Sequence, residues 1–148
     1  MNIVRRALQI ATIAHRGQYR NDNKTPYITH PIAVADKFKG KEAYYNDYFG
    51  INSQDLEAIA LLHDVIEDTP ADALTLIKQK IPCSLVDVIV TLTRLKHQDY
   101  LSYLLKVKDN LMAKFVKIED IKHNLSTLDS KNKTMRDKYL LALYILEH

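Results

Sequence analysis

Residues 58–70 read Ala58-Ile59-Ala60-Leu61-Leu62-His63-Asp64-Val65-Ile66-Glu67-Asp68-Thr69-Pro70. The first five residues are the apolar run of a buried helix, and the next six carry one imidazole and three carboxylates. Glu67 follows His63 by one helical turn and Asp64 by three residues, so we expect these three side chains to share a face. Burying such groups is costly unless a cation holds them, and a divalent metal is the simplest cation that would do so. Thr69-Pro70 is expected to end this helix.

The composition of the chain favours an all-α fold. Its 148 residues are enough for one domain with a substantial core, and the hydrophobic fraction of 47% and charged fraction of 26% are ordinary for a globular protein. Only three glycines and four prolines are present, which disfavours a hairpin-rich β fold. We therefore expect residues 1–148 to form one all-α domain, a bundle of about seven or eight helices.

Apolar residues recur at helical spacing along most of the chain. The pattern predicts helices over residues 2–16, 29–40, 53–68, 70–80, 84–95, 100–108, 111–128 and 135–146. Residues 41–52, which are rich in tyrosine, are expected to form a connection.

Several classes of protein are disfavoured by simple counts. A net charge of +3 is too small to indicate nucleic-acid binding. No apolar run approaches the roughly 20 residues that a membrane span needs, and residues 1–6 do not begin a signal peptide. Cys83 is the only cysteine, so no intramolecular disulfide can form. We expect a cytoplasmic protein whose partner is a small molecule rather than nucleic acid or a membrane; the oligomeric state is left open.

A second polar cluster lies in the helix expected over residues 111–128, where Lys117, Asp120 and Asn124 share one face. His30 opens the helix expected over residues 29–40, a position that helix propensity does not favour and that metal ligation would explain. Four candidate ligands therefore come from three helices: His30, His63, Asp64 and Asp120. Helical bundles often build metal sites in this way. Two imidazoles with two carboxylates favour Mn²⁺, Fe²⁺ or Co²⁺ over a structural zinc or an all-oxygen magnesium site.

A metal at such a site would polarise a phosphoryl group and lower the pKa of its water. Glu67 is then placed to orient or deprotonate that water, and Asp68 to assist it or to receive the proton. The residues thus predict hydrolysis of a phosphate ester or anhydride. The chain contains neither a GxxxxGK phosphate loop nor a GxGxxG dinucleotide motif.

The order and spacing of four segments resemble the HD-domain phosphohydrolases, and above all the (p)ppGpp hydrolase domain of RelA/SpoT proteins and the stand-alone small alarmone hydrolases. The segments are Gln18-Tyr19-Arg20, Thr25-Pro26-Tyr27-Ile28-Thr29-His30-Pro31, residues 61–69, and Val116-Lys117-Ile118-Glu119-Asp120 continuing to Asn124. The resemblance implies an HD-domain helical bundle in which His30, His63, Asp64 and Asp120 bind Mn²⁺. It also implies that Glu67 and Asp68 are the catalytic carboxylate pair, that Arg20 and Asn124 contact the nucleotide, and that the reaction removes the 3′-pyrophosphate of (p)ppGpp.

The chain departs from the family pattern at three positions. Asn21 follows Arg20 where the family often has a second cation, and Lys24 is our candidate to replace it. Ile121 and Ser126 stand where the family often has arginine. Fewer phosphate-binding cations leave three alternatives open: another phosphorylated nucleotide, a phosphomonoesterase acting on a nucleotide or an NADPH-like 2′-phosphate, and a non-catalytic nucleotide sensor. The four ligands and both carboxylates are all present, which favours an enzyme.

Overall fold

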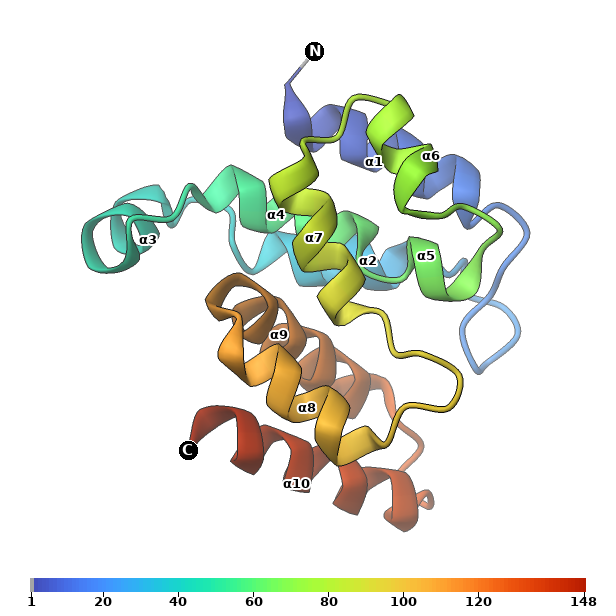
Figure 1. Cartoon of the computed structure of the whole chain (residues 1–148). Helices are drawn as coiled ribbons and strands as arrows, with labels where there is room; N and C mark the ends of the chain where they lie inside the picture. Colours follow the sequence, from blue (N-terminus) through green and yellow to red (C-terminus); the bar gives the residue numbers. More distant parts are fainter. Residues whose placement is uncertain (1) are drawn as a thin grey trace.

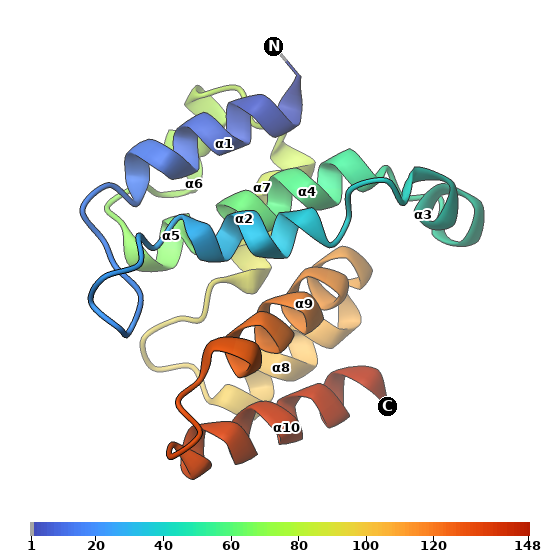
Figure 2. The same ribbon diagram turned by 180° about the vertical axis from the view of Figure 1, so that it is seen from behind.

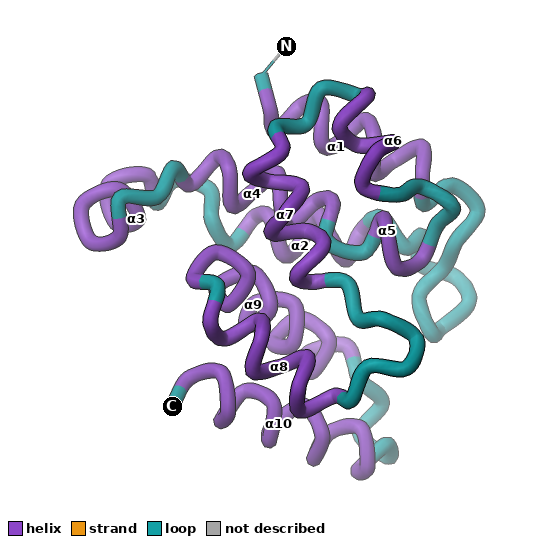
Figure 3. Tube along the Cα trace, viewed as in Figure 1, coloured by secondary structure: helices purple, strands orange, loops and turns teal. Residues whose placement is uncertain are grey.

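The structure is a computed structural model that describes residues 2–148, and it confirms the all-α class (Figures 1 and 3). Ten helices are present in these residues: α1 (Ile3–Ala14), α2 (Thr29–Asp36), α3 (Glu42–Phe49), α4 (Ser53–Leu62), α5 (Val65–Asp68), α6 (Ala73–Lys78), α7 (Cys83–Leu92), α8 (Tyr100–Asp109), α9 (Leu111–Thr127) and α10 (Lys133–Glu147). The only extended pairing described is an isolated antiparallel bridge between Tyr19 and Pro26, which closes the loop after α1.

Helix α4 is the centre of the bundle. It packs against α1, α2, α3, α7 and α9, and eight of its ten residues are buried. Figures 1 and 2 show α8, α9 and α10 gathered on one side of α4, with α1 and α6 on the other. The buried apolar side chains form one cluster; its largest members include Phe38, Leu56, Ile59, Leu62, Ile89 and Leu104. One domain over residues 1–148 stays a prediction.

The single helix predicted over residues 53–68 is wrong, because the chain turns at His63 and Asp64 and forms two helices, α4 and α5. The His63 imidazole contacts the backbone carbonyl of Ala60, the group that the amide of Asp64 would use in a continuing helix. A side chain that competes for a backbone acceptor in this way interrupts a helix. The turn brings Glu67 and Asp68 onto a separate short helix beside His63.

The connection predicted over residues 41–52 is also wrong, because it contains helix α3, which projects from the bundle in Figure 1. Tyr45 is buried and its ring lies 5.6 Å from that of Phe38, so one tyrosine anchors α3 to the core. Gly50 ends α3 with a φ of +64°, which suits glycine. Adding α3 and α5 to the eight predicted helices accounts for the ten observed, in place of the seven or eight expected.

Capping side chains set where two of the helices begin. Asn110 accepts a hydrogen bond from the Ala113 amide and so begins α9. Helix α6 begins at Ala73 rather than residue 70, because Asp72 and Thr75 form a reciprocal capping box there. Among the helices described, none combines the length and the apolar character needed to cross a membrane.

Candidate functional site

Three helices bring the four predicted ligands together. Helices α2, α4 and α9 each pack against the other two. His30 lies in the first turn of α2, His63 ends α4, and Asp120 lies in the second half of α9. These three side chains are almost completely buried, with 1%, 3% and 4% of their surface exposed. Polar groups at such depth need partners of opposite character.

His30, His63, Asp64 and Asp120 are partners for one another. Asp120 Oδ1 lies 2.7 Å from Nε2 of His30 and 3.2 Å from Nε2 of His63. Asp64 Oδ2 lies 3.0 Å from Nε2 of His63 and 3.8 Å from Nε2 of His30. One donor atom from each of the four residues falls within 4.8 Å of all the others.

The two carboxylates are held in place by neighbours outside this cluster. The Tyr27 hydroxyl donates to Asp64 Oδ2 at 2.6 Å, and Lys117 donates to Asp120 Oδ2 at 2.9 Å. Lys117 and Asp120 are three residues apart on α9, so the helix itself provides this contact. Because Oδ2 of Asp120 is taken by Lys117, Oδ1 is the oxygen that faces the two imidazoles.

The close approach of these charged groups shifts the pKa values of the cluster. Burial alone would lower the pKa of His63, but Asp64 and Asp120 outweigh burial and raise that pKa well above its ordinary value of 6.5. Burial alone would likewise raise the pKa of Asp120, but Lys117 and His63 hold it well below its ordinary value of 3.8. The cluster therefore favours carboxylates in their charged form and attracts positive charge.

The donor set fits a first-row divalent metal. Two imidazole nitrogens and two carboxylate oxygens point into one small buried space, and both carboxylates are kept ionised. Four such donors match the nitrogen-and-oxygen ligation that Mn²⁺ and Fe²⁺ accept. Each imidazole also has a partner for its second nitrogen, Ala60 for His63 and His123 for His30, as is usual for metal-binding histidines.

The Glu67–Asp68 pair lies beside the cluster on α5. Asp64, Glu67 and Asp68 form a second group of close carboxylates, of which Glu67 and Asp68 are exposed. Glu67 Oε1 accepts a hydrogen bond of 2.7 Å from the Arg94 amide, which fixes the carboxylate. Although Asp68 is exposed as a whole, its carboxyl group is partly shielded from water; this shielding and the neighbouring charges of Asp64 and Glu67 raise its pKa to about 6. One carboxylate is thus held rigidly, while the other retains a proton more readily.

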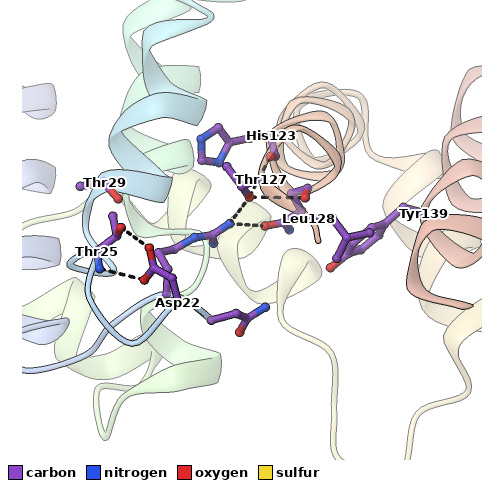
Figure 4. Close-up of a pocket in the computed structure, with 10 residues that line it drawn as sticks. Asp22, Thr25, Thr29, His123, Thr127, Leu128 and Tyr139 are labelled. Atoms are coloured by element: carbon purple, nitrogen blue, oxygen red, sulfur yellow. Dashed lines mark hydrogen bonds between the residues drawn. The ribbon is translucent and has the colours of Figure 1, made fainter. Parts of the chain in front are cut away.

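A pocket of about 270 Å³ opens between the loop after α1 and the end of α9 (Figure 4). In Figure 4, Asp22 and Thr25 come from the loop, His123 and Thr127 from α9, and Tyr139 from α10. The predicted nucleotide residues Arg20 and Asn124 both line this pocket.

Arg20 and Asn124 are joined to the buried cluster by hydrogen bonds. The Arg20 guanidinium donates to Asn124 Oδ1 at 3.1 Å and to Thr127 Oγ1 at 2.8 Å. Asn124 Nδ2 in turn donates to Asp120 Oδ1 at 3.3 Å. Lys24 is exposed on the loop and does not line the pocket, so its contact with a substrate stays a prediction.

Three residues of the site were missing from the predicted set, Tyr27, His123 and Thr127, whereas Lys117 was placed on the face of Asp120 without a role. Helical spacing would have pointed to His123 and Thr127, which stand three and seven residues after Asp120 on α9. His123 faces His30 on another helix, and Tyr27 lies in a loop. No spacing rule relates these last two residues to their partners.

Comparisons with known proteins agree with the geometry. No family model matches the chain. The guanosine-3′,5′-bis(diphosphate) 3′-pyrophosphohydrolase MESH1 of Drosophila melanogaster is 31% identical over 144 residues, which cover 90% of this chain and 76% of that protein. The bifunctional (p)ppGpp synthase/hydrolase SpoT of Escherichia coli is 32% identical over 137 residues, which cover 86% of this chain. The chain spans only 18% of the length of SpoT, so it matches one part of that longer relative.

A solved structure supports the same relationship. It is described as a metazoan ortholog of SpoT that hydrolyzes ppGpp, and it aligns over 99% of this chain and 84% of its own length. The TM-score is 0.71 and the sequence identity is 25%. The likeness therefore extends over the whole helical fold that holds the buried cluster.

Proposed function

The chain belongs to the family of guanosine-3′,5′-bis(diphosphate) 3′-pyrophosphohydrolases, and on this premise we propose that it removes the 3′-pyrophosphate of (p)ppGpp with the help of a divalent metal. The observation that carries the proposal is the convergence of His30, His63, Asp64 and Asp120 from distant segments, with Glu67 and Asp68 beside them.

The four converging residues would hold the metal, and Mn²⁺ is our proposal for its identity, with Fe²⁺ and Co²⁺ as the other ions that suit this donor set. When bound, such a metal supplies Lewis acidity toward a phosphoryl oxygen and makes water more acidic. Lys117 and Tyr27 keep the two carboxylates oriented, through the contacts at 2.9 Å and 2.6 Å.

Glu67 and Asp68 have different roles in the proposed reaction. Glu67, fixed by the Arg94 amide, takes a proton from the attacking water. The water oxygen forms a bond to the phosphorus of the 3′-diphosphate, and the bond from that phosphorus to the 3′ oxygen breaks. Asp68, whose pKa is raised to about 6, takes up a proton more readily than an ordinary aspartate and can supply it to the departing 3′ oxygen. The products are pyrophosphate and a nucleotide with a free 3′ hydroxyl.

The pocket beside α9 would take the rest of the nucleotide. Its Arg20 guanidinium carries a positive charge with a planar set of donors, which suits phosphate or the edge of a base. Asn124 connects Arg20 to Asp120, so the nucleotide pocket and the metal ligands form one hydrogen-bonded unit. Lys24, exposed on the same loop, is proposed as a further contact for phosphate.

Product analysis tests this function directly. The Mn²⁺-loaded protein is incubated with a nucleotide panel that includes ppGpp, pppGpp, NADPH and simple nucleoside monophosphates, and the products are separated by chromatography. We expect pyrophosphate from ppGpp and pppGpp. Release of orthophosphate instead would identify a phosphomonoesterase, and binding without turnover would identify a nucleotide sensor. The same panel with Glu67→Gln protein controls for a contaminating phosphatase.

A further inference from the structure

The two histidines of the cluster differ in what supports them. Each ring turns Nε2 toward the carboxylates. His63 contacts the backbone carbonyl of Ala60 through Nδ1, whereas Nδ1 of His30 lies 2.7 Å from Nδ1 of His123. A backbone carbonyl supports His63, so this contact does not depend on which side chain residue 60 carries. The support of His30 depends on a single side chain.

Helix α9 holds the His30 ring at both of its nitrogen atoms. Asp120 contacts Nε2 and His123 contacts Nδ1, each at 2.7 Å. Asp120 and His123 are three residues apart, so they lie on the same face of α9. The His30 and His123 rings are 4.9 Å apart between centroids and tilted by 30°. This arrangement fixes both the position and the rotation of the His30 ring.

Only one placement of protons lets His30 bind a cation and keep this contact. A nitrogen that ligates a metal carries no proton, so neutral His30 has its proton on Nδ1 when Nε2 is the ligand. An N–H group can donate only to an unprotonated nitrogen. Nδ1 of His123 must therefore be the acceptor, and the proton of neutral His123 must sit on its own Nε2.

We infer that His123 is a positioning residue for the metal: by accepting from Nδ1 of His30, it fixes the tautomer and orientation of that ligand and strengthens cation binding at the cluster. Groups that orient a ligating histidine typically change metal affinity by about 10- to 100-fold when they are removed. The inference rests on the proposed function only in taking the cluster as a metal site, and it does not depend on the substrate.

His123 also reaches the substrate side of the protein. It is partly exposed and lines the same pocket as Arg20 and Asn124. Figure 4 shows His123 on α9 beside Thr127. A residue that only contacted a nucleotide would alter substrate affinity and leave metal affinity unchanged. Metal affinity measured without nucleotide therefore separates the two roles.

Two substitutions at this position form the test. His123→Phe keeps a planar ring but removes the acceptor, whereas His123→Asn can place its side-chain oxygen near the position of Nδ1. Mn²⁺ affinity is measured without nucleotide from the electron paramagnetic resonance signal of the free ion, with circular dichroism as a check on folding. We expect His123→Phe to bind Mn²⁺ about 10- to 100-fold more weakly and His123→Asn to recover most of the loss. Lys122→Ala, an exposed neighbour, should match the parent protein.

Two results of the variant experiment would overturn the inference. One is unchanged Mn²⁺ affinity in His123→Phe, and the other is an equal loss in His123→Phe and His123→Asn, because asparagine retains an acceptor. Nitrogen-15 NMR of the imidazoles in the Zn²⁺-loaded parent provides a measurement that needs no variant. We expect His123 with its proton on Nε2, and a proton on Nδ1 would refute the role. Failure of the parent to hydrolyse ppGpp would remove the proposed substrate but would not alter these affinity comparisons.

Discussion

Oδ1 of Asp120 lies 2.7 Å from Nε2 of His30, although 90 residues separate them in the sequence. The contact joins α9 to α2, and α4 brings His63 to the same oxygen at 3.2 Å. Two nearly buried imidazoles around one carboxylate oxygen do not form a hydrophobic core. They form a site whose charges are arranged for a cation.

Removal of one imidazole should remove the metal. In His63→Ala, three donors remain, and Asp64 loses its nearest imidazole at 3.0 Å. We expect Mn²⁺ affinity to fall by at least about 100-fold, more than the 10- to 100-fold typical for residues that only orient a ligand. Metal content after dialysis, measured by plasma mass spectrometry, reports the loss. His97→Ala removes an exposed histidine that is not one of the predicted ligands and should retain full metal content; equal content in both variants would exclude His63 as a ligand.

Neutralising Glu67 should stop turnover and leave the metal bound. Glu67→Gln keeps an oxygen that can accept from the Arg94 amide but cannot take a proton from water. We expect kcat to fall by about 10²- to 10⁴-fold, the usual contribution of a general base, with Mn²⁺ content unchanged. Glu42→Gln, an exposed carboxylate on α3, is the matched control. Turnover of Glu67→Gln at the parent rate would assign the base to another residue.

Removal of the Arg20 side chain should lower substrate affinity rather than metal affinity. Its guanidinium donates to Asn124 and Thr127 at the pocket wall, so Arg20→Ala removes a charged donor from the proposed nucleotide site. Hydrogen bonds to charged groups contribute about 1.5–3 kcal/mol, which corresponds to a rise in KM of roughly tenfold or more. Steady-state kinetics with ppGpp gives this value. Arg16→Ala, an exposed arginine at the end of α1, should leave KM unchanged, and so should Arg20→Ala if the nucleotide binds elsewhere.

The loop that carries Arg20 should be stabilised by an unusually acidic aspartate. Hydrogen bonds from the Thr25 hydroxyl and from the amides of Thr25 and Lys24 lower the pKa of Asp22 from 3.8 to about 2. A carboxyl group whose pKa is lower in the folded state stabilises the fold above its ordinary pKa, and this contribution is lost as the pH falls from about 4 to about 2.

Carbon-13 NMR of the Asp22 carboxyl group checks the prediction. At pH 3.5 an ordinary aspartate is more than half protonated, whereas Asp22 should still show the chemical shift of a carboxylate. Thr25→Val removes the hydroxyl donor while keeping the side-chain shape, and it should move the titration of Asp22 to higher pH. A midpoint near 3.8 in the parent protein would mean that the hydrogen bonds around Asp22 do not persist in solution.

The sequence was informative where local rules apply. Apolar periodicity predicted eight helices, because one buried face repeats about every 3.6 residues whatever the helix packs against. The shared face of Lys117, Asp120 and Asn124 followed from the same spacing, and the structure places Asp120 in contact with the other two. The break at His63 escaped this reasoning, because it depends on a side chain that contacts the backbone of its own helix.

The sequence by itself determined that this protein is helical and that imidazoles and carboxylates occur at spacings suited to metal chemistry, since both properties depend on neighbours a few residues apart. Only the tertiary structure decided that His30, His63 and Asp120 meet around one oxygen atom and that His123 supports His30 from the other side. These contacts join segments that are 57 to 93 residues apart. They exist because α2, α4 and α9 bury their apolar faces against one another, and that packing fixes where the polar groups between them lie.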